Sequence, residues 1–87
     1  MINRLLKSII PQSVDLWLFQ SKWRRRNKHN KTTAVNKFDI RKVVCDVGTY
    51  GPLKIKMWGH EQEKLRLGKY CSISEGVVFI LGGNHYI

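Results

Sequence analysis

Cysteines, acidic residues and long apolar runs are all scarce in this chain of 87 residues. Its two cysteines, Cys45 and Cys71, have no CxxC spacing and no nearby histidine pair, which excludes a recognisable zinc or redox motif. We expect both to be buried thiols in a reducing cytosol rather than a disulfide. The longest apolar stretch, residues 77–81, is far shorter than the roughly 20 residues that span a bilayer. No signal peptide is recognisable either, so we expect a cytoplasmic protein without a metal site.

The shortage of acidic residues leaves a formal net charge of +10. Residues 1–44 carry +9 of this charge, whereas residues 45–87 carry +1. A basic front half can attract nucleic acid, an anionic membrane surface or an acidic partner, and the sign of the charge does not choose among them.

The basic front half, residues 1–35, is predicted to be a helical N-terminal segment. Pro11 ends a first short helix, and Ser13 is a suitable N-cap for a second one. Six of the ten residues 22–31 are Lys or Arg, a composition that suits the C-terminal end of a helix. Apolar side chains recur at helical spacing within this second helix, namely Leu16, Phe19 and Trp23, with Trp17 beside them.

Two interpretations of this helix stay open. Its apolar stripe can pack on the rest of the protein and leave the basic face in solvent, which is the usual role of a run of charges. Alternatively, a basic helix that carries tryptophan can associate weakly with a membrane surface or bind a polyanion. No nucleic-acid-binding fingerprint is present, so nucleic acid is not the expected partner.

The remaining residues, 36–87, are predicted to be mostly β. A strand is expected around Val43 and Val44, followed by glycines and a proline with turn chemistry. In residues 53–57 apolar side chains alternate with lysines, which predicts a half-exposed strand. Residues 61–64 are expected to form a polar surface loop.

From residue 64 onward the apolar residues form pairs that repeat every six residues. The spacing of two within a pair places both side chains on one face of a short strand, and the repeat of six implies that the chain then turns a corner. This pattern predicts a triangular coil of short parallel strands, although an ordinary alternating sheet is the competing interpretation. The three pairs are Leu65 and Leu67, Cys71 and Ile73, and Val77 and Phe79.

The amino-acid sequence of this stretch resembles that of one known family. Residues 67–77, LGKYCSISEGV, and residues 79–85, FILGGNH, resemble hexapeptide-repeat acetyltransferases of the branch that modifies xenobiotics, sugars and polysaccharides. Upstream, residues 47–52, VGTYGP, and the Trp58-Gly59 pair resemble the segment that precedes the coils in that branch. The resemblance covers about half the chain, and the Gly-Gly-Asn-His run is its most specific feature. It implies that residues 36–87 contain the lead-in strands and first coil of a left-handed parallel β-helix.

The resemblance also implies a function. Such enzymes move an acetyl group from acetyl-CoA to a hydroxyl or amine of a sugar, polysaccharide or antibiotic acceptor, and they work as homotrimers. His85 falls at the family's general base, and a free imidazole, with a pKa of about 6.5, is suited to accept the acceptor's proton. Asn84 and Tyr50 are the candidate substrate-binding residues. A solvent-exposed histidine near a chain end, and core or interface packing for Tyr50 and Trp58, are the competing interpretations.

The family's pattern continues for several more coils, which carry the CoA groove, whereas this sequence stops at Ile87. We therefore expect an N-terminal fragment that lacks activity on its own and that exposes an unpaired coil edge. The rival expectations are a small basic module that binds nucleic acid or a membrane surface, and the product of a disrupted gene. The acceptor, and whether oxygen or nitrogen is acetylated, are left open by the sequence.

Overall fold

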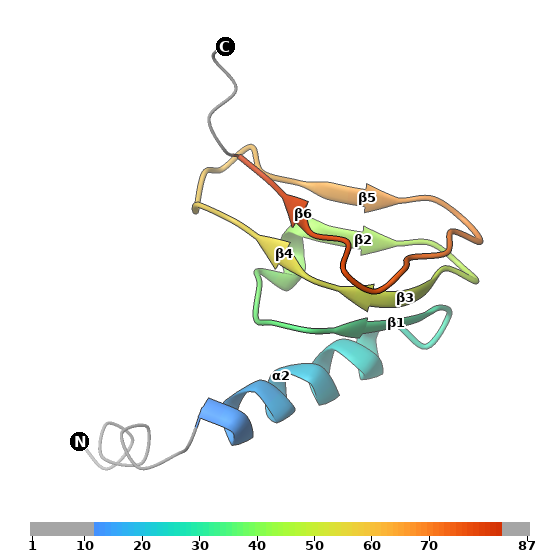
Figure 1. The fold of residues 1–87 in the computed structure, drawn as a ribbon, viewed down its shortest axis with the longest axis horizontal. Helices are drawn as coiled ribbons and strands as arrows, with labels where there is room; N and C mark the ends of the chain where they lie inside the picture. The colour runs from blue at the N-terminus through green and yellow to red at the C-terminus, as the bar shows by residue number, and fades with distance from the viewer. Residues whose placement is uncertain (1–11, 83–87) are drawn as a thin grey trace.

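The computed structural model describes residues 12–82 of the chain (Figure 1). Within these residues an α-helix is followed by a series of short strands, with a 3-10 turn between the first two strands. None of the helices in this range has the length and apolar content of a membrane span. In chain order the elements are α2 (Gln12–Arg26), β1 (Lys31–Ala34), η1 (Ile40–Lys42), β2 (Val43–Cys45), β3 (Tyr50–Leu53), β4 (Ile55–Lys56), β5 (Leu65–Leu67) and β6 (Phe79–Ile80).

The strands pair in parallel with segments 19 to 24 residues further along the chain. β1 pairs with β3, β2 with β5 and β4 with β6, in the registers Lys31↔Tyr50, Val43↔Leu65 and Ile55↔Phe79. An isolated parallel bridge between Tyr50 and Ser72 adds a third layer beside β3. Parallel neighbours cannot be joined by a tight hairpin, so the chain has to travel around before it returns. This pairing is what a stacked coil requires; that the stack is a left-handed β-helix stays a prediction.

The interior of the stack is filled by side chains at alternate positions of the strands. Leu53 and Ile55 are buried, whereas Lys54 and Lys56 are exposed, so the predicted alternation is confirmed. The expected single strand is, however, divided at Lys54, and its two halves pair with different partners. The buried apolar core consists of Trp23, Ala34, Val43, Cys45, Leu53, Ile55 and Ile73.

The predicted helical segment was too long at its C-terminal end. The helix α2 ends at Arg26, and β1 occupies residues that were expected to be helical. Two buried asparagines accompany the change of direction. The Asn27 side chain donates to the carbonyl of Trp23, and the backbone amide of Asn30 donates to the backbone carbonyl of Asn27. At the other end α2 already includes Gln12, so Ser13 is not its N-cap. The short helix predicted before Pro11 lies outside the described residues.

The six-residue repeat holds for the first predicted pair and for half of the second. Leu65 and Leu67 pack on the core from β5, and Ile73 is buried, whereas Cys71 is half-buried and does not belong to the core. The third pair was wrong, because Val77 is exposed and the residues that pack on the core are Phe79 and Leu81. A turn closed by the hydrogen bond from the Val77 amide to the Ser74 carbonyl inserts extra residues there and shifts the inward pair by two positions.

One edge of the stack is closed by α2, which lies alongside β1 (Figure 1). The Arg24 guanidinium donates to the carbonyls of Asn30, at 2.9 Å, and Thr32, at 2.7 Å. The Gln20 amide donates to the carbonyl of Ala34 at 2.8 Å. These carbonyls point away from β3 and would otherwise lack partners at a strand edge. Trp23, 1% exposed, anchors the helix through a hydrogen bond from its indole nitrogen to the Thr32 hydroxyl.

Two further asparagine side chains close the corresponding edges of β2 and β4. The Asn30 amide nitrogen donates to the carbonyl of Cys45 at 3.0 Å, while its oxygen accepts from the amide of Thr32 at 3.1 Å. The Asn36 side chain donates to the carbonyl of Ile55 and accepts from the amide of the same residue, at 2.7 and 2.9 Å. A single amide side chain thus replaces a neighbouring strand at each place.

Candidate functional site

The predicted site residues divide between the described residues and the rest of the chain. Asn84 and His85 lie outside the described residues. Tyr50 opens β3, and its side chain is 51% exposed. Its backbone lies opposite Ser72 and bonds to the carbonyl of Cys71 and the amide of Ile73. Trp58 follows β4 and is 55% exposed. Packing of Tyr50 or Trp58 in the core of this chain was therefore wrong, and contact with a ligand or a neighbouring subunit stays a prediction for both.

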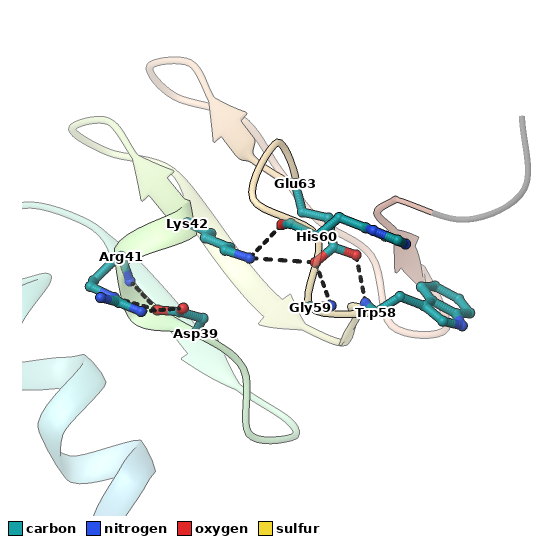
Figure 2. Close-up of polar contacts among 7 residues, drawn as sticks. All are labelled: Asp39, Arg41, Lys42, Trp58, Gly59, His60 and Glu63. Atoms are coloured by element: carbon teal, nitrogen blue, oxygen red, sulfur yellow. Dashed lines mark hydrogen bonds and ion pairs between the residues drawn. The ribbon is translucent and has the colours of Figure 1, made fainter.

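The one buried acidic side chain among the described residues is Glu63, in the loop that was expected to be a polar surface loop. Its side chain is fully buried, so that expectation was wrong for this residue. The carboxylate accepts hydrogen bonds from the backbone amides of Trp58, at 2.5 Å, and Gly59, at 2.8 Å. The loop is folded around this carboxylate (Figure 2). We call this arrangement, including Lys42, the Glu63 clamp.

Lys42 brings a positive charge to the clamp from the other side (Figure 2). It ends the 3-10 turn η1 just before β2, and its ammonium group lies 3.6 Å from a Glu63 carboxylate oxygen. The same ammonium group donates to the carbonyl of His60 at 2.6 Å. The amide of Glu63 also donates to that carbonyl, at 3.2 Å. Lys42 therefore ties the loop to the end of η1 through one ion pair and one hydrogen bond.

The surroundings of Glu63 keep it ionised. Burial by itself would raise the pKa of the carboxyl group, because it removes water from the charged form. The hydrogen bonds from the amides of Trp58 and Gly59 and the charge of Lys42 outweigh that effect, so the pKa of Glu63 lies below its ordinary value of 4.5. The Glu63 carboxylate is therefore negatively charged at neutral pH, where it can accept hydrogen bonds from the backbone but cannot donate a proton.

The Glu63 clamp lies directly against the point where the chain leaves β6. A Cβ atom on Gly82 would overlap the Glu63 carboxylate, and Gly82 has a positive φ of 66° that other residues rarely adopt. Just before it, the amide of Leu81 donates to the carbonyl of Lys56 at 2.9 Å. The start of the Gly-Gly-Asn-His run is thus packed closely against a buried carboxylate. Glycine at position 82 has a steric reason.

A signal for Glu63 was present in the sequence. Glu63, Leu65 and Leu67 are spaced two apart, and the structure places all three on the side of the strand that faces inward. Extending the alternation of β5 by two positions would have predicted burial of this carboxylate. The acidic composition of residues 61–63 pointed instead to a solvated loop.

The cysteines and histidines among the described residues form no second site. Cys45 is buried and Cys71 half-buried, and both are free thiols. Burial raises the pKa of Cys45, and a hydrogen bond with Thr32 counteracts this to some extent, so the thiol is a core group. His29 and His60 are exposed, and His29 contacts the carbonyl of Cys45 at 2.8 Å. Within residues 12–82 no cluster of His, Cys, Asp or Glu could hold a metal ion.

No family model, curated protein or solved structure matches this chain. The resemblance to hexapeptide-repeat acetyltransferases accordingly remains a prediction based on the motifs.

Proposed function

We propose that this chain is the start of a left-handed parallel β-helix of an acyl-CoA-dependent acetyltransferase. The observation that supports this most is the parallel pairing of successive short strands immediately before the Gly-Gly-Asn-His run. The Glu63 clamp adds to it, because its carboxylate packs closely against Gly82, three residues before His85. A general base has to be held in place to be effective, and close packing directly before the Gly-Gly-Asn-His run serves that end.

In the proposed reaction, His85 accepts the proton of an acceptor hydroxyl or amine while the acceptor's oxygen or nitrogen attacks the thioester carbonyl of acetyl-CoA. The C–S bond then breaks, CoA leaves as a thiolate that takes up a proton, and the acetyl group stays on the acceptor. A positioned base of this kind contributes about 10²–10⁴-fold. Asn84 and the exposed Tyr50 would contact the acceptor, which is a sugar, polysaccharide or antibiotic.

Acetyl-CoA would act as a co-substrate, and the functional form would be a homotrimer with the active site between subunits. The outward position of Tyr50 on β3 is compatible with that arrangement, because its side chain is available to a neighbouring subunit or to a ligand.

The proposal is tested by following release of the CoA thiol with a panel of sugar and antibiotic acceptors. The protein is assayed as this chain and also joined to whatever sequence its reading frame continues with. His85→Ala should lower turnover by about 10²-fold or more, because the base is removed. His60→Ala is the matched control, since His60 is exposed in the loop of the Glu63 clamp and should leave turnover unchanged.

Turnover in either form that depends on His85 but not on His60 would support the proposal. No turnover in any form, or turnover that survives His85→Ala, would refute it.

A further inference from the structure

The outward face of α2 is apolar where a helix on a protein surface is normally polar. Trp17 is 61% exposed, and Leu18 and Val14 are also largely exposed. Their spacing of three and four residues places all three on one side of the helix. The opposite side, with Phe19 and Trp23, packs on the core. The helix thus carries two apolar faces, and within residues 12–82 only one of them packs against the core.

Four exposed basic residues accompany this outward face, namely Lys22, Arg25 and Arg26 on α2 and Lys28 just after it. None of the four forms an ion pair with another of the described residues. The one acidic side chain of the helix, Asp15, is paired with Lys37 at 2.6 Å. The outer surface of the helix therefore has an uncompensated positive charge next to exposed apolar side chains.

We propose that this outward face of α2 docks on an anionic lipid bilayer, with Trp17 and Leu18 in the headgroup region and the basic residues against lipid phosphates. Helices that lie in a membrane interface combine an apolar face that includes tryptophan with Lys and Arg beside it. The charge complements an anionic lipid surface, which attracts each nearby cation by about 1 kcal/mol. A second copy of this chain would bring like charges together, and a nucleic acid would leave Val14 and Leu18 without an apolar partner. The proposal is independent of the acetyltransferase activity.

The charge requirement is tested by co-sedimentation of the full chain with vesicles of phosphatidylcholine alone and of phosphatidylcholine mixed with phosphatidylglycerol. We expect binding to the mixed vesicles, weak binding to the neutral ones, and loss of binding as salt is added. Reversal of two charges on α2, Lys22→Glu with Arg25→Glu, should weaken binding by about tenfold or more. The matched control is Lys54→Glu with Lys56→Glu, which changes the net charge equally on exposed residues of the strands and should have a much smaller effect. Far-UV circular dichroism checks that both variants are folded.

The apolar requirement is tested by quenching of tryptophan fluorescence with brominated lipids in the unmodified chain. Quenching should be lost in Trp17→Phe and kept in Trp58→Phe, because the two residues are similarly exposed but only Trp17 is on α2. This readout does not depend on the folding of the charge variants. Equal binding to neutral and anionic vesicles, equal effects of the two charge reversals, or quenching that follows Trp58 would each overturn the proposal, as would an absence of vesicle binding.

Discussion

The strands at the two ends of the parallel stack differ in what lies against their outer edges. The outer edge of β1 is covered by side chains of α2, that of β2 by the Asn30 side chain, and that of β4 by the Asn36 side chain. At the other end, β5 and β6 are the outermost strands, because each sheet in residues 12–82 has two strands. The backbone of Arg66, Ser72 and Ile80 on this side has no hydrogen-bonded neighbour among the described residues.

This difference indicates a direction in which the stack can grow. An uncovered strand edge is a template for further pairing, whereas a covered one ends the sheet. In the proposed β-helix, the helix and the amide side chains at the covered end would be the polar cap that solenoid folds need at a terminus. The end near β5 and β6 is where another coil or another chain would pair.

The largest expected effect comes from breaking the covered end at Asn30. In Asn30→Ala the amide and the hydroxyl of Thr32 lose the oxygen that accepts their hydrogen bonds, and the side-chain oxygen of Asn27 loses its donor. Each such buried group costs about 1–3 kcal/mol. We expect a loss of about 4 kcal/mol in the free energy of unfolding, measured by urea denaturation. A loss below about 1 kcal/mol would contradict the role assigned to this residue as the centre of the cap.

At the open end, Gly82→Ala should be almost as harmful. Alanine at this position would have to adopt a positive φ, which is unfavourable, and its Cβ would displace the Glu63 carboxylate. We therefore expect a loss of about 3 kcal/mol in the free energy of unfolding. Gly76→Ala is the matched control, because Gly76 has a positive φ of 87° but open space around its Cα. It should lose only about 1 kcal/mol. Equal losses in the two variants would show that Glu63 does not hold Gly82.

A smaller effect is expected from Asn36→Ala. Its side chain is only partly buried and holds a single residue, Ile55, so water can replace some of the lost hydrogen bonding. We expect about 2 kcal/mol in the same urea experiment. The comparison with Asn30→Ala separates a buried amide from a partly buried one. A larger loss for Asn36→Ala than for Asn30→Ala would reverse the order of importance within the cap.

The smallest effect concerns the pH dependence of the Glu63 clamp. Since the pKa of Glu63 is lower in the folded state than its ordinary 4.5, its contribution to stability is complete above pH 4.5 and is lost as the pH falls through the folded value. Glu63→Gln removes this contribution. The variant should melt roughly 5 °C below the unmodified chain near neutral pH, and this gap should close in acid. Glu61→Gln, in the same loop but exposed, should show no gap at any pH.

Much of the strand pattern was predictable from the sequence, and the covered edge was not. The alternation around Leu53 and Ile55, and the inward pairs of β5 and Ile73, follow from a period of two, which depends on the chain alone. The exposure of Val77 could not be predicted, because it depends on a turn hydrogen bond that inserts residues. The strand at β1 was missed because lysine and threonine there have little apolar periodicity. It forms because β3 and α2 lie on either side of it.

The candidate site was predictable to a similar degree. The Gly-Gly-Asn-His run was visible in the sequence, whereas the carboxylate that supports Gly82 comes from a loop about 20 residues earlier. Such a contact depends on how the coils stack, and no local pattern encodes it. The packing face of α2 was predicted correctly at Phe19 and Trp23, which pack on the core, whereas the second apolar face around Trp17 was not recognised as a separate face.

Residue-resolved hydrogen exchange of the backbone amides tests the difference between the two ends most directly. The amide of Thr32, on the covered edge, should exchange at least about tenfold more slowly than those of Arg66, Ser72 and Ile80 on the open edge. Comparable protection at both ends, or faster exchange at Thr32, would contradict a stack that is covered at β1 and open at β5 and β6.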